Sequence, residues 1–257
     1  MLWTVKGRGT IKLVASVHLL PAADPRLRMI AERVLPGADV IALEADINTI
    51  NGDWGALQAG TLKEIVGEAR WERIHILAGK LNLDLEELDK LQPWAVGQLL
   101  TVVQLSVSGA TFDHGVDVVI RQAVEAAGKS VTFLESVSSQ HDACEKAPLN
   151  EQLRMLDELL DNPEKPLADY YEIQRAWQTG EIGALDAFLA ERLAHFPATF
   201  ERLVILRNRS WMPKILELAN SERTSVIVVG ALHLVGPTGL PALLSAQGLE
   251  VSFAPAA

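Results

Sequence analysis

An apolar run that ends at a histidine, Val226-Ile227-Val228-Val229-Gly230-Ala231-Leu232-His233, is typical of a buried β-strand. A similar string near the amino end, Leu13-Val14-Ala15-Ser16-Val17, runs into His18. A histidine in an apolar setting costs free energy unless it is paired or ligated. Two histidines in the same local setting therefore indicate one site that the fold assembles from both ends of the chain.

Two carboxylates follow shorter apolar runs in the same way. Val40-Ile41-Ala42-Leu43 runs into Glu44, and Val131-Thr132-Phe133-Leu134 runs into Glu135. In open parallel sheets, ligands bind outside the carboxyl ends of the strands. If the four strands are parallel neighbours, two imidazoles and two carboxylates gather at one edge. We call these four residues the rim: His18, Glu44, Glu135 and His233.

The order of the elements predicts an α/β fold with a central, mostly parallel sheet flanked by helices. Strands at 3–6 and 10–17 flank Gly7-Arg8-Gly9, which predicts an amino-terminal hairpin. Further strands are expected at 40–44, 130–135, 225–230 and 250–253. Helices are expected at 25–35, 54–58, 61–81, 85–91, 94–107, 114–127 and 239–247.

An inserted helical block is predicted at about 145–222, where we expect it to cap one edge of the sheet. No linker rich in Pro, Gly or Ser divides the chain, so we expect a single domain over residues 1–257.

Composition excludes several classes of function. The net charge of −10 argues against a nucleic-acid groove, which needs a basic stripe. Residues 91–112 carry no charge and are long enough to span a membrane, but Pro93 and several Gln and Ser residues indicate a buried helix instead. Cys144 is the only cysteine, so an intrachain disulfide and a Cys-based zinc site are excluded.

Two kinds of chemistry suit the rim. Two His and one or two carboxylates suit a Zn²⁺, Mn²⁺ or Co²⁺ site. They equally suit a metal-free site in which a His is the general base and a Glu orients it. The spacing cannot choose between these, because the residues lie far apart in the sequence and no His-Glu-x-x-His string is present.

Other polar residues are candidates for the same site. Arg207 could hold Glu44 or an anionic group of a substrate, and Gln140 could line the site from a polar loop after Glu135. Asp117 lies at the start of a helix, where a carboxylate favours the helix dipole. Cys144 follows His141 and is either a nucleophile or, as we expect, a free thiol in a loop.

Several short motifs match those of a known family: Ala15-Ser16-Val17-His18 and Gly230-Ala231-Leu232-His233, Leu43-Glu44, Gly115-Val116-Asp117, Leu134-Glu135 with Gln140, Arg207-Asn208, and residues 234–248. With them the chain resembles the TraB/PrgY/GumN family, to which the TIKI metalloproteases belong. It is more distantly similar to the ChaN-type haem-binding lipoproteins and the erythromycin esterases. One departure is Ala15, which stands where the family's first Gly-x-x-His motif has glycine.

The resemblance implies an α/β fold and, for the TIKI branch, a metal-dependent peptidase that uses Mn²⁺ or Co²⁺. We therefore expect a metal-dependent, peptidase-like hydrolase acting on a peptide or small molecule. His18, Glu44 and His233 would hold the ion, and Glu135 would be a fourth ligand or the general base. Arg207 would stabilise an oxyanion or a substrate carboxylate.

Two other functions stay open. One is a metal-independent, esterase-like hydrolase with His18 or His233 as base, and the other is a non-catalytic protein that binds haem or a peptide. Many bacterial relatives carry a signal peptide just before a Leu-Trp start, so we expect a periplasmic or secreted protein if one precedes Met1, and otherwise a cytoplasmic one. The oligomeric state is not predicted.

Overall fold

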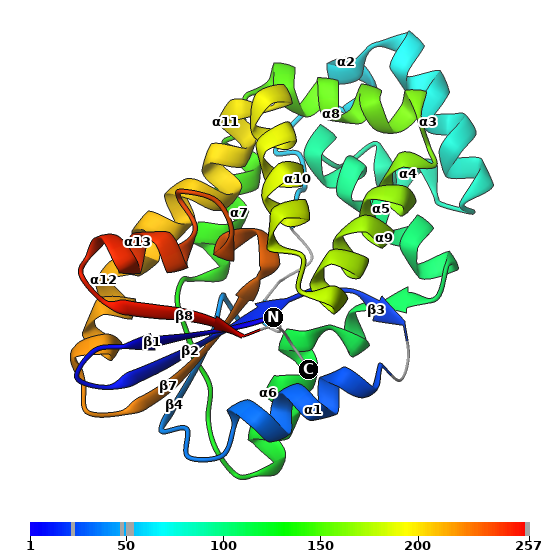
Figure 1. Ribbon diagram of the computed structural model, residues 1–257. Helices are drawn as coiled ribbons and strands as arrows, with labels where there is room; N and C mark the ends of the chain where they lie inside the picture. Colours follow the sequence, from blue (N-terminus) through cyan, green and yellow to red (C-terminus); the bar gives the residue numbers. More distant parts are fainter. Residues whose placement is uncertain (22–23, 47–48, 50–53, 255–257) are drawn as a thin grey trace.

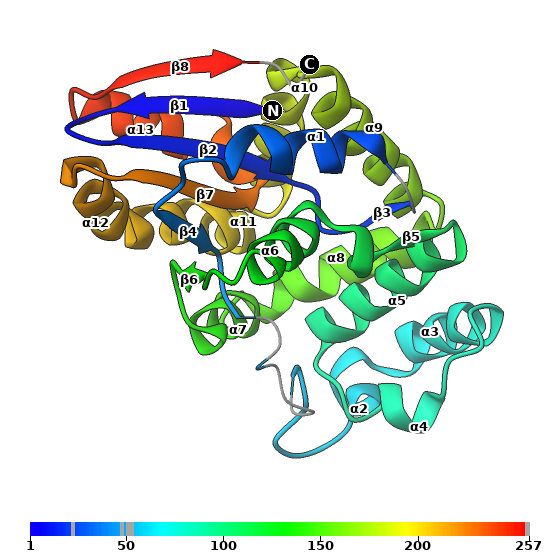
Figure 2. The same ribbon diagram turned by 90° about the horizontal axis from the view of Figure 1, so that it is seen from below.

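Six strands form a mixed sheet in the order β6-β4-β7-β2-β1-β8, which Figure 2 shows and of which Figure 1 gives a second view. The computed structural model describes residues 1–21, 24–46, 49 and 54–254. β2 and β4 both pair with β7 in parallel, β4 pairs with β6 in parallel, and β1 is antiparallel to β2 and β8. The strands are β1 (Leu2–Lys6), β2 (Thr10–Ser16), β4 (Val40–Leu43), β6 (Thr132–Phe133), β7 (Thr224–Gly230) and β8 (Glu250–Ala254). This architecture confirms the α/β fold with a mostly parallel sheet.

The amino-terminal hairpin is confirmed as well. β1 and β2 pair with Lys6 opposite Thr10, so the turn between them is Gly7-Arg8-Gly9. A two-stranded sheet of β3 (Leu20–Pro21) and β5 (Ala110–Thr111) was not expected.

Helices cover both faces of the central sheet (Figure 1). One face carries α12 (Arg207–Asn220) and α13 (Leu240–Ala246), and the other carries α1 (Pro25–Val34) and α6 (Val116–Ala126). β7 is buried from Ser225 to Val229. A strand covered on both faces has no solvent side, which explains why its sequence is a continuous apolar run.

A group of helices, which we call the helical lobe, has an apolar core of its own. It consists of α2 (Leu62–Val66), α3 (Glu68–Lys80), α4 (Leu85–Leu88), α5 (Pro93–Val107) and α8 (Leu149–Asp161). α5 joins the two cores, because Val96 and Leu100 pack in the lobe while Leu105 packs in the core around the sheet.

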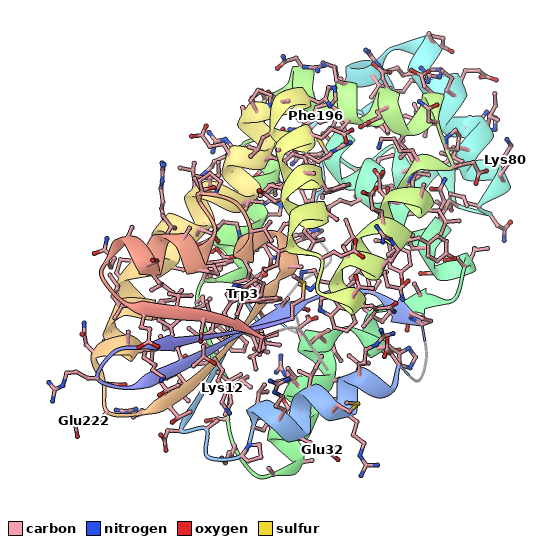
Figure 3. All side chains as sticks on the ribbon, viewed as in Figure 1. Trp3, Lys12, Glu32, Lys80, Phe196 and Glu222 are labelled. Atoms are coloured by element: carbon pink, nitrogen blue, oxygen red, sulfur yellow. The ribbon has the colours of Figure 1, made fainter. Side chains whose placement is uncertain are left out.

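The parallel strands run toward the helical lobe. Figure 2 shows the sheet at one end of the molecule and the lobe at the other. In Figure 3, Glu222 lies beyond the amino end of the sheet and Lys80 lies on the far side of the lobe. The carboxyl ends of the parallel strands therefore face the helical lobe.

Two expectations about helices are wrong. The helix expected at 61–81 is two helices, because Gly67 has a φ of 78° that ends α2 before α3 begins. Residues 54–58 form a turn in which Ala56 bridges to Leu91, not a helix.

The inserted helical block expected at about 145–222 is confirmed, since helices fill almost all of it. These helices do not all lie at one edge of the sheet, because α8 packs in the lobe and α12 covers one face of the sheet. After α7 (Val137–Glu145) and α8, it contains α9 (Lys165–Thr179), α10 (Ile182–His195), α11 (Pro197–Phe200), the π-helical turn η3 (Glu201–Leu206) and α12.

The apolar segment 91–112 contains α5, which has 15 residues. Among the described residues, no helix is both long and apolar enough to cross a membrane.

Candidate functional site

The strand order brings the rim together. β6, β4, β7 and β2 are consecutive and parallel, and each is followed by one rim residue. From one side of the sheet to the middle these are Glu135, Glu44, His233 and His18. The prediction that two imidazoles and two carboxylates lie together at the carboxyl ends of the parallel strands is therefore confirmed.

Three of the rim side chains converge over Gly230, which ends β7. A Cβ atom at this glycine would lie 3.3 Å from His18 Nε2, 3.4 Å from Glu44 Oε1 and 3.6 Å from His233 Cδ2. The Gly230 N–H also donates to Glu44 Oε1 at 2.6 Å. The missing side chain leaves a small space that both imidazoles and one carboxylate face.

His233 follows β7 in a single turn, η4 (Ala231–Leu234), and is buried. The amide nitrogen of Asn208 donates to the carbonyls of His233 and Thr238, at 3.1 and 2.9 Å. The amide oxygen of Asn208 must then accept from His233 Nδ1, which lies 2.7 Å away. This arrangement places the imidazole proton on Nδ1 and leaves Nε2 as an acceptor.

His18 is held in a similar way by another element. Its Nδ1 lies 3.3 Å from Asp117 Oδ1, an oxygen that also accepts from the Ser16 hydroxyl at 2.8 Å. The His18 side chain is 44% exposed, so the site opens to solvent on this side. Burial lowers the pKa of His18, but the Asp117 carboxylate outweighs it and raises that pKa above its usual value.

Arg207 contacts three of the rim residues, which are Glu44, Glu135 and His233. Its Nε and Nη2 donate to Glu135 Oε1 at 2.9 and 2.7 Å, and Nη2 also donates to Glu44 Oε2 at 2.5 Å. Its Nη1 donates to the Leu203 carbonyl at 3.0 Å and lies 3.2 Å from His233 Nε2. A guanidinium has five N–H groups, and these contacts use all of them. The binding of an oxyanion or a substrate carboxylate by Arg207 stays a prediction, which would require one of these contacts to break.

Both carboxylate oxygens of Glu135 accept hydrogen bonds from other side chains. Besides the two bonds from Arg207 to Oε1, its Oε2 accepts from the Trp211 indole at 3.1 Å. Its side chain is 6% exposed. The Trp211 ring also packs on both the Arg207 guanidinium and the His233 ring. Glu135 thus anchors Arg207, and its role as a fourth ligand or general base stays a prediction.

The charge states of Glu44 and His233, which are both buried, follow from these contacts. Burial opposes the charge of Glu44, but Arg207 outweighs that effect and holds the pKa of this carboxyl below its usual range. For His233, burial and the nearby Arg207 lower the pKa to about 3, against the opposing pull of Glu44. Glu44 is therefore a carboxylate and His233 a neutral imidazole at neutral pH.

A π-helical turn directs Arg207 and Asn208 toward the rim. Along α10 to α12 the buried positions advance by three or four residues, as an α-helix requires, except for a step of five between Thr199 and Val204. That step coincides with η3, where the wider turn changes the helix phase. The Arg207 peptide N–H bonds to the Val204 carbonyl, and its guanidinium bonds to the Leu203 carbonyl. The turn thus supplies one of the contacts that hold the guanidinium.

Gln140 is not joined to this network. It lies on α7, and its side-chain oxygen is buried with no hydrogen-bond partner among the described residues. The partners Asn208, Asp117 and Ser16 were not predicted as such. The one available signal was that Ser16 precedes His18 by two positions and so shares its side of the chain.

A second group of metal-ligand side chains lies on α7. Of the described residues, only His141, Asp142 and Glu145 offer three such atoms within 4.8 Å of one another. However, His141 Nε2 accepts from the Gly55 N–H at 3.4 Å, and its Nδ1 lies 3.3 Å from Glu145 Oε2. Lys146 pairs with Asp142 at 2.5 Å. These contacts already satisfy the cluster, so we regard it as structural. The ligand atoms of the rim residues do not meet this limit, because no three of them lie within 4.8 Å of one another.

A shallow apolar hollow of about 330 Å³ lies between α1 and α6. Its walls include Leu35, Ile41 and Val124, with Glu32 and Lys129 among its polar residues. No rim residue lines it, so the hollow takes no part in the chemistry of the rim.

Cys144 lies on α7, not in a loop, and is buried. Burial raises the pKa of this thiol to about 11, so thiolate is scarce at neutral pH. We expect iodoacetamide to modify native Cys144 at pH 7.5 at least about tenfold more slowly than the unfolded chain, whose thiol pKa is near 8.5. Mass spectrometry with and without denaturant measures this ratio. Equal rates would contradict the buried, protonated thiol.

The comparison with known proteins agrees with the motifs. The model of the TraB/PrgY/gumN family matches residues 1–252. The chain belongs to this family. The TraB/PrgY/gumN match covers all four rim residues and every strand of the sheet except the last two residues of β8.

Two curated proteins are similar over nearly the whole chain. The uncharacterized protein YbaP of Escherichia coli (strain K12) is 24% identical over 243 residues, which cover 94% of this chain and 90% of YbaP. The uncharacterized protein YbaP of Shigella flexneri matches with the same identity and coverage. No solved structure matches significantly.

Proposed function

We propose that the chain is a metal-dependent, peptidase-like hydrolase whose ion is held by His18, Glu44 and His233. The observation that carries the proposal is the way both imidazoles are held. Each Nδ1 faces a side-chain oxygen, of Asp117 or Asn208, and each imidazole presents its other edge to the space over Gly230. Histidines that bind metals are usually oriented by such a second hydrogen bond.

The donor set fits a divalent ion. Two imidazole nitrogens and a carboxylate oxygen suit Mn²⁺, Co²⁺ or Zn²⁺, and three protein ligands leave room for water and substrate. When bound, the ion would lower the pKa of a water molecule and polarise the carbonyl of a substrate.

The other residues of the site act by orienting the donors. Asp117 and Asn208 fix the two imidazole rings, and the Gly230 N–H fixes Glu44 Oε1. Arg207 holds the second oxygen of Glu44. Because His18 is the exposed member of the set, a peptide or small-molecule substrate would approach from its side.

A second candidate, a metal-independent hydrolase, has one observation in its favour. None of the described residues forms a hydrogen bond with His18 Nε2, so this nitrogen can take a proton from water at a pH above the raised pKa of His18. An imidazole backed by a carboxylate is a common general base. This candidate uses His18 alone and needs no ion.

Metal content and hydrolysis together test the proposal. Protein purified without chelator is analysed for Mn, Co and Zn, and assayed on peptide and ester libraries before and after chelation. We expect bound metal in the wild-type protein and in His195→Ala, a control at an exposed histidine on α10. We expect its loss, with loss of hydrolysis, in His18→Ala and His233→Ala.

The other outcomes separate the alternatives. Metal retained by both rim variants would defeat the metal-dependent proposal, and hydrolysis that survives chelation would favour the Asp117–His18 base. No turnover at all, together with a Soret band on adding haem, would favour a binding protein over both.

A further inference from the structure

Arg207 is a cation that already occupies the charged part of the site. Its side chain is 11% exposed and lies between the carboxylates of Glu44 and Glu135, whose side chains are 8% and 6% exposed. Two buried carboxylates without a partner would strongly destabilise the fold. The guanidinium therefore supplies the positive charge that these two carboxylates need.

One of the Arg207 contacts uses an atom that the ion needs. Asn208 Oδ1 accepts a hydrogen bond from His233 Nδ1–H, so the only lone pair on a nitrogen of that ring is on Nε2. Arg207 Nη1 points at this lone pair from 3.2 Å. The same Nε2 lies 3.9 Å from Glu44 Oε1, so an ion bound by both would lie where the N–H now points.

Apart from the bond from Nη2 to Glu44 Oε2, the remaining contacts of Arg207 involve no proposed ligand of the ion. Nε and Nη2 bond to Glu135, and Nη1 also bonds to the Leu203 carbonyl. Glu135 itself is fixed by Trp211. The guanidinium can therefore give up His233 and stay docked on Glu135.

We propose that Arg207 is a resident cation that competes with the metal ion for His233 and Glu44, and that Glu135 is the dock that keeps it when the ion enters. The proposal rests on the proposed function, since it assumes that the rim binds a divalent ion. It assigns Glu135 a positioning role. It also predicts that the chain can fold before an ion binds, since Arg207 pairs with both Glu44 and Glu135. Two like charges a few ångströms apart in a buried site repel strongly, so Arg207 weakens metal binding.

A charge-compensated variant tests this competition. Arg207→Gln combined with Glu135→Gln removes one positive and one negative charge and leaves His18, Glu44 and His233 intact. Mn²⁺ is titrated calorimetrically into chelator-treated protein, and unfolding by urea is followed separately. The matched control is Arg192→Gln with Glu158→Gln, another buried arginine with a carboxylate at 2.8 Å, located on α10 and α8.

We expect the Arg207 double variant to bind Mn²⁺ at least about tenfold more tightly than the wild-type protein, and the Arg192 control to match the wild type. Unchanged or weaker binding by the Arg207 double variant would overturn the competition while the proposed function stands. Binding of Mn²⁺ by neither protein would overturn both.

A measurement on the unmodified protein covers the case in which the double variant does not fold. Arginine side-chain NMR signals are recorded on chelator-treated protein before and after Zn²⁺ is added. We expect the Arg207 Nη1 protons to lose protection from exchange while the Nε proton, docked on Glu135, keeps it. If Zn²⁺ binds and neither signal changes, Arg207 does not give way to the ion.

Discussion

Arg207→Gln, as a single substitution, is expected to lower the free energy of unfolding by about 3–5 kcal/mol in the absence of metal. The substitution leaves the buried carboxylates of Glu44 and Glu135 without their shared cation. It also removes the donor to the Leu203 carbonyl. Urea denaturation followed by circular dichroism measures the effect.

Two further variants show whether charge is the cause. Adding Glu135→Gln to Arg207→Gln should restore a large part of the lost stability, because one unpaired carboxylate is removed. Arg209→Gln, at an exposed position on the same helix, should change stability by less than about 0.5 kcal/mol. A loss below about 1 kcal/mol for Arg207→Gln would mean that the two carboxylates do not depend on this guanidinium.

Gly230→Ala should weaken metal binding by at least about tenfold while the protein stays folded. The new methyl group would lie 3.3 Å from His18 Nε2 and 3.4 Å from Glu44 Oε1, inside the space that the donors share. The backbone at Gly230 has a φ of −52° and a ψ of 140°, which alanine adopts without strain. The expected loss of stability is at most about 1–3 kcal/mol, the usual range for overpacking.

A glycine elsewhere provides the comparison. Gly97 lies in α5, and a Cβ atom there would meet no atom within 4 Å. Gly97→Ala should leave metal binding unchanged and should not destabilise the helix. Calorimetric titration of Mn²⁺ into the wild-type protein, Gly230→Ala and Gly97→Ala measures the three affinities. Wild-type affinity in Gly230→Ala would show that the ion does not bind over this glycine.

The sheet and the rim could be predicted because they depend on short-range patterns. Apolar runs without alternation mark strands buried on both faces, and parallel strands bring their carboxyl ends to one edge. Glu44 and His233 therefore meet although 188 intervening residues separate them. Ala15, which departs from the family's glycine, is fully buried in β2 opposite Val229, below the level of the rim. That position tolerates a methyl group, whereas Gly230 borders the site.

The pairing of the polar side chains could not be predicted in the same way. Arg207 reaches Glu44 and Glu135 because η3 changes the phase of the helix before α12 begins. The step of five residues between the buried positions Thr199 and Val204 can be recognised only once burial is known. Asp117 has the sequence context of an ordinary first-turn carboxylate, and only the packing of α6 against β2 brings it to His18. The split of the expected helix 61–81 likewise depends on the left-handed backbone of Gly67.

Direct measurement of bound metal tests the central claim. Chelator-treated wild-type protein, His18→Ala, His233→Ala and His141→Ala are each titrated with Mn²⁺, and the stoichiometry is checked by elemental analysis. We predict one ion per chain for the wild type and for His141→Ala, and none for the two rim variants. One ion per chain in both rim variants, or its loss only in His141→Ala, would contradict a metal site at the rim.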